Sequence, residues 1–304
     1  MLELRALQRY KAGIEGLDEL VLRYAEIILA KFLRIRTDTY KSFHARKIRK
    51  LFRREDAYHI KEVMMPLLDD ETERAFFYNM FYDTFTSYCY FEDKYDEKTF
   101  DSCDKFLSEG LYGLVNDRVN VTVMPGDIVI DAGSWIGDFA AYASVKGATT
   151  YAFEPTDSTF AILQETAQLN GNIIPVKKGL SDESANIPLF ESTKGSTSFN
   201  SFMSKTEGQD FSASYKVETV RLDDFVRENN LPRIDFIKAD IEGFERRMLA
   251  GAQETLARFA PKLALCTYHL PDDPQVMAEL IMQANPKYHI VQKRKKLFAS
   301  VPQE

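Results

Sequence analysis

The feature that most constrains the fold is an alternation of short apolar runs with helix-like segments after about residue 125. The apolar runs predict five strands, at Val129–Ile130, Tyr151–Phe153, Ile173–Val176, Ile234–Ile237 and Leu263–Cys266. Strands that alternate with helices imply a parallel sheet with helices on both faces. We therefore expect a doubly wound α/β domain.

Two of the intervening helices have recognisable boundaries. Asp157 or Ser158 is placed to cap a helix that runs to Asn170, and Gly171 is a typical terminator. A second helix is predicted over 244–258. Residues 192–214, rich in Ser, Gly, Thr and Lys, interrupt the rhythm and predict a long linker or a functional lid.

The chain divides by pattern into three zones. Residues 1–55 predict a helical segment, 56–120 an aromatic-rich helical region and 121–304 a Rossmann-like domain. Apolar residues in the first zone recur in steps of three and four, at Leu7, Tyr10, Ile14, Leu17, Val21, Tyr24 and Ile28. Such a heptad stripe indicates a helix that either lies on its own domain or pairs subunits, so a homodimer through residues 1–33 is one expectation.

Composition excludes several classes of protein. Of the 304 residues, 45% are hydrophobic and 28% are charged, as in ordinary globular proteins, and the net charge of −7 disfavours nonspecific attraction to nucleic acid. The basic run at 41–54 is expected to be a solvated helix face. Three scattered cysteines predict neither a zinc site nor disulfides. Without a leader-like start or a transmembrane run, we expect a cytoplasmic protein.

A glycine-containing loop follows the first predicted strand, over Asp131–Gly137. Gly133 lets the backbone approach a ligand, and Gly137 permits close packing of the next helix. The loop lacks the G-x-G-x-x-G of dehydrogenases, and it carries a carboxylate at Asp131. An acidic rim suits the ammonium and sulfonium of S-adenosylmethionine better than the pyrophosphate of NAD.

A second acidic residue, Glu154, ends the next predicted strand about 20 residues later. At this position an acidic side chain hydrogen-bonds the ribose hydroxyls of a nucleotide. The loop and Glu154 together predict a site for S-adenosylmethionine.

Acidic residues and a histidine follow the fourth and fifth predicted strands. Asp240 and Glu242 lie two apart, so they would share one face in extended backbone, and His269 follows the neighbouring strand. Ligands bind at the carboxyl ends of strands in open α/β sheets. We expect these three side chains to form the catalytic group.

Methyl transfer to a hydroxyl requires a group that takes the acceptor's proton, because an alcohol is about as weak an acid as water, with a pKa near 15.7. A neutral His269 would serve as the base, and the rate would then rise with pH through a pKa near 6.5. The alternative is Mg²⁺ held by the carboxylates. The metal-free base is preferred, since it needs no further ligands.

Several of these motifs, in this order, resemble the FkbM family of methyltransferases over about residues 125–301. The motifs are Ile130–Gly133 with Gly137, Phe153–Pro155, Leu222–Asp224, Ile237–Glu245 and Tyr268–His269. The resemblance implies a seven-stranded Rossmann-like sheet and O-methylation of a sugar or polyketide hydroxyl. It places Asp240, Glu242 and His269 at the substrate. The expected cofactor-binding residues are Asp131, Gly133, Ser134, Gly137, Glu154 and Asp240. Ala239 and Trp135 depart from the family pattern.

Three other functions stay open at this stage. A nucleic-acid methyltransferase would need an Asn or Asp-Pro-Pro-aromatic motif or a Pro-Cys nucleophile, and the chain has neither. A non-catalytic binding module could use the same fold. A dehydrogenase is disfavoured by the missing glycine motif.

Overall fold

The computed structural model describes residues 52–60, 62–69, 112–192, 211–293 and 295–302, together with residues 21, 24, 25, 72, 73 and 76. They belong to two compact units, residues 1–62 with 67–111 and residues 63–66 with 112–304. Most of the heptad stripe, most of the basic run and nearly all of the aromatic stretch lie outside the described residues. The expectations for those segments, including the homodimer, stay predictions.

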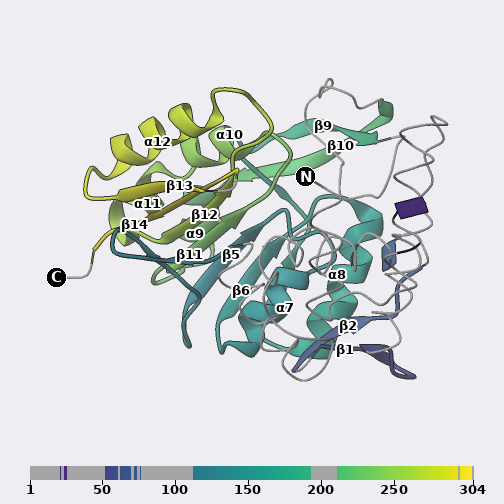
Figure 1. The fold of residues 1–304 in the computed structure, drawn as a ribbon. Coiled ribbons are helices and arrows are strands. Elements are labelled where there is room, and N and C mark those ends of the chain that lie inside the picture. Colours follow the sequence, from purple (N-terminus) through teal and green to yellow (C-terminus); the bar gives the residue numbers. More distant parts are fainter. Residues whose placement is uncertain are drawn as a thin grey trace. The chain divides into compact units, whose positions relative to one another are not determined.

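The second unit is built on a seven-stranded sheet (Figure 1). Across the sheet the strands are β13 (His289–Lys293), β14 (Lys296–Ser300), β12 (Lys262–Cys266), β11 (Phe236–Ala239), β5 (Ile128–Ala132), β6 (Thr149–Phe153) and β7 (Ile173–Val176). β12, β11, β5, β6 and β7 are parallel, and β14 is antiparallel to both of its neighbours. The expected Rossmann-like sheet is confirmed, with the carboxyl ends of β5 and β11 side by side.

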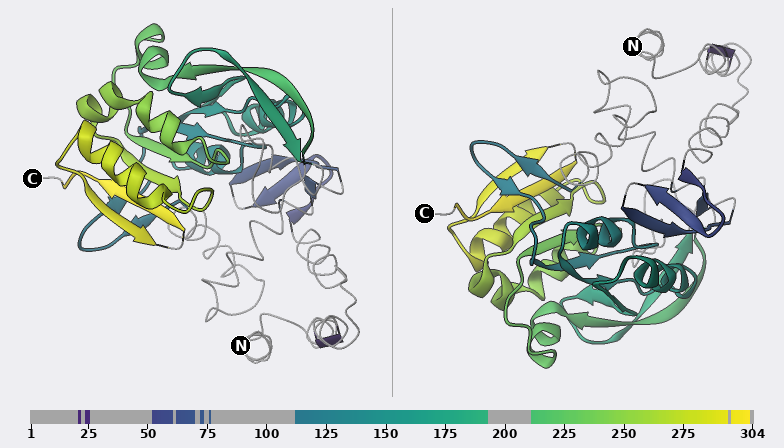
Figure 2. Two further views of the ribbon diagram at one scale, coloured as in Figure 1. Left: turned by 90° about the horizontal axis from the view of Figure 1, so that it is seen from above. Right: turned by 90° about the horizontal axis from the view of Figure 1, so that it is seen from below.

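Helices cover both faces of this sheet. One face carries α7 (Asp138–Val145) and α8 (Asp157–Asn170), and the other carries α9 (Leu222–Glu228), α10 (Glu245–Ala250), α11 (Gln253–Phe259) and α12 (Asp273–Ala284). The teal helices face the viewer in the right-hand view of Figure 2, and the green and yellow helices do so in the left-hand view. This is the two-sided cover that the alternating pattern predicts.

The register of the central strands sorts their side chains between the two faces. Ile130 and Ile237 are paired positions on β5 and β11, and both belong to the core that packs against α9–α12. Asp131 and Lys238 are the next pair in the same register. Because side chains alternate along a strand, these two charges share the opposite face.

The C-terminal boundary of α8 is the predicted one, whereas its N-terminal boundary differs from the prediction. α8 ends at Asn170, with Gly171 at φ 67 as its C-cap, but its N-cap is Thr156 rather than Asp157 or Ser158. The helix predicted over 244–258 is interrupted at Gly251. A Cβ there would lie 2.1 Å from the Ser181 carbonyl oxygen, so the break lets the chain pass close to a neighbouring backbone.

A second sheet of three strands lies beside the seven-stranded one. Its order is β8 (Gly179–Ser181), β10 (Phe211–Arg221) and β9 (Asn186–Ser192). The predicted loop 192–214 therefore has strand at both ends, and residues 193–210 lie outside the described part.

The described part of the zone that was expected to be helical contains short strands as well as helical residues at 72, 73 and 76. The strands are β1 (Ala57–Ile60), β2 (Val63–Pro66), β3 (Leu114–Val115) and β4 (Asn120–Val121). In the second unit, the Asn170 amide donates to the Met64 carbonyl (2.7 Å) and accepts from its N–H (2.9 Å), which holds β2 on α8. None of the helices in the described residues has the length and apolar character needed to span a membrane.

Candidate active site

The loop between β5 and α7 is fixed to both neighbouring strand ends. The N–H groups of Gly133 and Ser134 both donate to the Phe153 carbonyl at the end of β6, at 3.1 and 2.9 Å. Ser134 Oγ donates to the Asp131 carbonyl (2.8 Å). Gly133 has φ 71, and a Cβ would lie 2.0 Å from the Asp240 carbonyl oxygen. Only glycine allows this loop to touch the segment after β11.

Gly137 has the packing role that the sequence predicts. Its φ is 85, and a Cβ would lie 2.7 Å from Leu163 Cδ1 and 3.1 Å from Thr166 Cγ2 of α8. The glycine therefore sets the close approach of the start of α7 to α8.

Glu154 is a buried carboxylate that orders the same loop. Its Oε2 accepts from the Trp135 N–H (3.0 Å), and its Oε1 accepts from the Thr156 N–H (2.9 Å). Burial raises the pKa of Glu154, while these backbone donors favour its charged form. The side-chain hydroxyls of Thr156 and Thr159 favour the charged form as well.

Asp131 lies beneath the loop rather than on its rim. It is fully buried, and Lys238 Nζ lies 3.0 Å from its Oδ1. Lys238 also donates to the Gly133 carbonyl (2.6 Å). Burial opposes a charged lysine, but Asp131 and Asp240 outweigh it and raise the pKa of Lys238. The expectation that Asp131 forms an acidic rim therefore does not hold, because its charge is matched by the lysine on the next strand.

Asp240 stands at the end of β11 between two tyrosines. Its Oδ2 accepts from the Tyr112 hydroxyl (3.1 Å), and its Oδ1 accepts from the Tyr268 hydroxyl (2.8 Å). Burial alone would raise the pKa of Asp240, but Lys238 and His269 hold that pKa below its ordinary value. Asp240 is thus a carboxylate at neutral pH.

The backbone after Asp240 turns sharply instead of continuing as a strand. Glu242 has φ 52 and Gly243 has φ 98. Glu245 stabilises the turn, since its two oxygens accept from the N–H groups of Ile241 (2.9 Å) and Gly243 (3.0 Å). Asp240 and Glu242 were expected to share a face of extended backbone, and this was wrong. The turn, rather than an extended strand, places both side chains next to His269.

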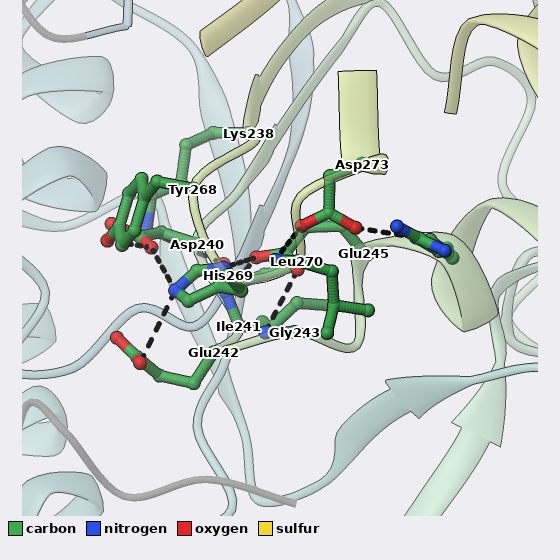
Figure 3. A network of polar contacts seen from close by, with 12 residues as sticks. Lys238, Asp240, Ile241, Glu242, Gly243, Glu245, Tyr268, His269, Leu270 and Asp273 are labelled. Carbon is green, nitrogen blue, oxygen red and sulfur yellow. Dashed lines mark hydrogen bonds and ion pairs between the residues drawn. The ribbon is translucent and has the colours of Figure 1, made fainter. Parts of the chain in front are cut away.

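His269 lies within a group of three carboxylates (Figure 3). Its Nε2 is 3.3 Å from Glu242 Oε2 and 4.0 Å from Asp240 Oδ1, and its Nδ1 is 3.3 Å from Glu245 Oε1. Burial disfavours the charged ring, but Glu242 and Glu245 overcome it and raise the pKa of His269 to about 11. Without a cation at this position, the carboxylates therefore favour the imidazolium over the neutral ring with a pKa near 6.5 that the sequence analysis expected. The role of His269 as the base stays a prediction.

The loop after β12 is anchored from the other side. Asp273, fully buried at the start of α12, accepts from the Leu270 N–H (2.7 Å) and from Arg246 Nε (2.5 Å). These contacts fix the residue that follows His269, as Figure 3 shows. The position of the imidazole is therefore set by two helices, α10 and α12.

The structure brings most of the predicted residues to one edge of the sheet. Gly133 contacts the Asp240 backbone there, and the side chains of Asp240 and Glu242 face His269. Sequence reasoning assigned no role to Lys238 or Glu245. Lys238 had a detectable signal, because it and Asp131 are charged residues within otherwise apolar strands. Tyr112, far from any motif, had none.

A comparison with known families agrees with this geometry. The model of the methyltransferase FkbM domain matches residues 131–289, just over half of the chain. The chain belongs to the FkbM methyltransferase family. The match begins at Asp131 and includes every predicted site residue.

Two curated relatives of this FkbM-family chain act on different molecules by name. The hexuronic acid methyltransferase AglP of Haloferax volcanii is 31% identical over 159 residues, which are 52% of this chain and 62% of the relative. The 31-O-demethyl-FK506 methyltransferase FkbM of Streptomyces tacrolimicus is 28% identical, over 45% of this chain and 64% of the relative. The chain thus spans slightly less than two thirds of the length of either relative.

A solved structure of methyltransferase FkbM from Methylobacillus flagellatus KT is also similar. It has 17% sequence identity and a TM-score of 0.47, and the match covers 86% of this chain and 60% of that one.

Proposed function

We propose that this chain transfers a methyl group from S-adenosylmethionine to a hydroxyl of a sugar, a glycan or a secondary metabolite. The observation that carries the proposal is the direct contact between the Gly133 loop and the Asp240 backbone. A methyl donor held at the loop would lie beside the cluster of Asp240, Glu242 and His269. The names of the two curated relatives, a hexuronic acid and an FK506 methyltransferase, support acceptors of this kind.

The residues around the loop fit the proposed cofactor. Glu154 directly follows β6, the position at which an acidic side chain binds ribose hydroxyls, and the Trp135 indole N–H is buried without a hydrogen-bond partner among the described residues. S-adenosylmethionine supplies an electrophilic methyl on a sulfonium. Asp131, Ser134 and Gly137 contribute by shaping the loop.

The acceptor would lie at the Asp240 side of the loop. Its oxygen attacks the methyl carbon as the carbon–sulfur bond breaks, and the hydroxyl proton must leave toward the cluster of Asp240, Glu242 and His269. Tyr268 is 46% exposed beside this cluster, and its hydroxyl donates to Asp240, so it is placed to contact the acceptor.

We also propose a cytoplasmic location on composition alone.

Cofactor binding is tested by replacing Glu154 with alanine. We expect the affinity for S-adenosylhomocysteine to fall by about 1.5–3 kcal/mol, or about 10- to 150-fold, because hydrogen bonds to a charged group are lost. Isothermal titration measures the change. Glu165→Ala, an exposed glutamate on α8, is the matched control and should bind as the wild type does. Equal affinity in both variants would remove Glu154 from the site.

Methyl transfer is tested with labelled S-adenosylmethionine and a panel of uronic acid saccharides, neutral glycans, polyketide alcohols and RNA. We expect label in a saccharide or polyketide product that survives mild alkali, because a methyl ether is stable there whereas a methyl ester is hydrolysed. An alkali-labile product would show a carboxylate acceptor, and labelled RNA would favour a nucleic-acid methyltransferase. Binding of S-adenosylhomocysteine without transfer to any acceptor would favour a non-catalytic module.

A further inference from the structure

The catalytic cluster contains more than acidic side chains. One oxygen of Asp240, one oxygen of Glu242 and a ring nitrogen of His269 all lie within 4.8 Å of one another. They come from the ends of two adjacent parallel strands, β11 and β12. The histidine side chain is 3% exposed, whereas both carboxylates are partly open to solvent. The cluster is therefore a buried imidazole facing two accessible carboxylates.

Glu245 fixes the orientation of the imidazole, on the side of the ring away from Asp240 and Glu242. Nδ1 faces the fully buried Glu245, which is itself held by two backbone N–H groups, so Nε2 is the nitrogen that faces the cluster. Both ring nitrogens are buried at ion-pair distances from carboxylates, yet neither is aligned as a hydrogen bond. A carboxylate behind one nitrogen is the usual support for a histidine whose other nitrogen binds a metal ion.

The distances between these groups suit a shared cation. Ligand atoms about 2.0–2.2 Å from a metal ion are separated by about 3 Å at right angles and by about 3.4 Å at the tetrahedral angle. His269 Nε2 is 3.3 Å from Glu242 Oε2 and 4.0 Å from Asp240 Oδ1. The first separation already matches, and the second exceeds the tetrahedral value by about 0.6 Å and the right-angle value by about 1 Å.

We propose that Asp240, Glu242 and Nε2 of His269 bind one divalent cation of the first transition row, with Mn²⁺ as the best-fitting occupant. Imidazole is a ligand for transition metals, whereas carboxylates suit Mg²⁺ and Mn²⁺. A mixed set of two carboxylates and one imidazole therefore favours Mn²⁺ over Mg²⁺ and Ca²⁺. Three protein ligands leave coordination positions for water and an acceptor oxygen.

The site deepens the proposed function and rests on it for its role. A divalent cation at this position would lower the pKa of an acceptor hydroxyl held next to it. The proton then passes to solvent, the oxygen–carbon bond forms and the carbon–sulfur bond breaks. The products are a methyl ether, S-adenosylhomocysteine and one proton.

Metal binding is tested on the full chain without relying on turnover. After EDTA treatment and dialysis, the protein is titrated with Mn²⁺ while the electron paramagnetic resonance signal of free Mn²⁺ is recorded. We expect one site per chain, which Zn²⁺ displaces more readily than Mg²⁺. Glu242→Gln and His269→Ala should each weaken Mn²⁺ binding by more than about 100-fold, beyond the loss seen when a supporting residue is changed. Glu254→Gln, an exposed glutamate on α11, should bind Mn²⁺ as the wild type does.

Isothermal titration of S-adenosylhomocysteine on the same preparations separates the two proposals. If S-adenosylhomocysteine binds and methyl transfer continues in EDTA while Mn²⁺ and Zn²⁺ do not bind, the metal site is refuted and the proposed function stands. Mn²⁺ binding that both variants retain also refutes the site. If Mn²⁺ binds as expected but no methyl is transferred, the site stands and the proposed function fails. Glu242 is more accessible than His269, so its variant provides the test if His269→Ala does not fold.

Discussion

Replacing His269 by alanine is expected to lower kcat by about 10²–10⁴-fold while the affinity for S-adenosylhomocysteine changes little. The imidazole is buried after the end of β12 within 4.0 Å of both Asp240 and Glu242, whereas the Gly133 loop, where we propose the cofactor binds, is held by Glu154 and Lys238. Its loss removes an interaction made as the acceptor's proton leaves, which costs several kcal/mol in the transition state. Single-turnover rates with labelled cofactor measure the effect.

His289→Ala provides the matched control, because His289 is exposed on the edge strand β13. That variant should keep the wild-type kcat. The pH profile adds a second readout, since the imidazolium in this arrangement predicts no rise in rate through a pKa near 6.5. A His269→Ala enzyme with nearly full activity in EDTA would contradict both a basic and a metal-binding role. Catalysis would then rest on positioning, which supplies up to about 7–11 kcal/mol.

The sheet was predictable because its strands are buried on both faces. Val129–Ile130, Ile173–Val176 and Leu263–Cys266 are apolar runs that all belong to strands of the seven-stranded sheet. The order of these strands across the sheet cannot be read from the runs. The break at Gly251 was not predictable, because it depends on the Ser181 backbone, which is distant in the sequence.

The proximity of Asp240, Glu242 and His269 was predictable from the sequence, whereas their detailed geometry was not. The rule that ligands bind at carboxyl ends of parallel strands brought Asp240 and His269 together correctly. The left-handed conformation of Glu242 was missed, because glutamate rarely adopts it and the cause is the Glu245 carboxylate on the turn. The raised pKa of His269 was missed for a similar reason, since Glu242 and Glu245 face its two ring nitrogens.

The role of Asp131 shows how register changes an interpretation. From the sequence alone, a carboxylate that follows a strand and precedes a glycine is expected to contact the ligand. In the structure, Asp131 on β5 is the register partner of Lys238 on β11, so their side chains meet on one face. Strand order decides this pairing, and strand order is not visible in a single sequence.

Replacing Lys238 by methionine is expected to lower the free energy of unfolding by about 3–5 kcal/mol. The change keeps the unbranched shape and most of the length of the side chain but leaves Asp131 as an uncompensated buried charge, and it removes the donor to the Gly133 carbonyl. Urea denaturation followed by circular dichroism measures the loss. Lys262→Met is the control, because Lys262, the first residue of β12, pairs with Asp127 at 2.6 Å but is 20% exposed. Water can reach that site, so the control should lose less stability.

A double variant, Asp131→Asn with Lys238→Met, tests whether buried charge is the cause. If the unpaired Asp131 carboxylate causes most of the loss in unfolding free energy, replacing it by Asn should restore part of the stability lost in Lys238→Met. Buried ion pairs in which both partners are replaced are often tolerated. The double variant should still bind S-adenosylhomocysteine more weakly than the wild type, because the loop carbonyl of Gly133 remains without its donor. A double variant no more stable than Lys238→Met would contradict the charge argument. The hydrogen bonds from Lys238 to the loop would then account for the stability of this edge of the sheet.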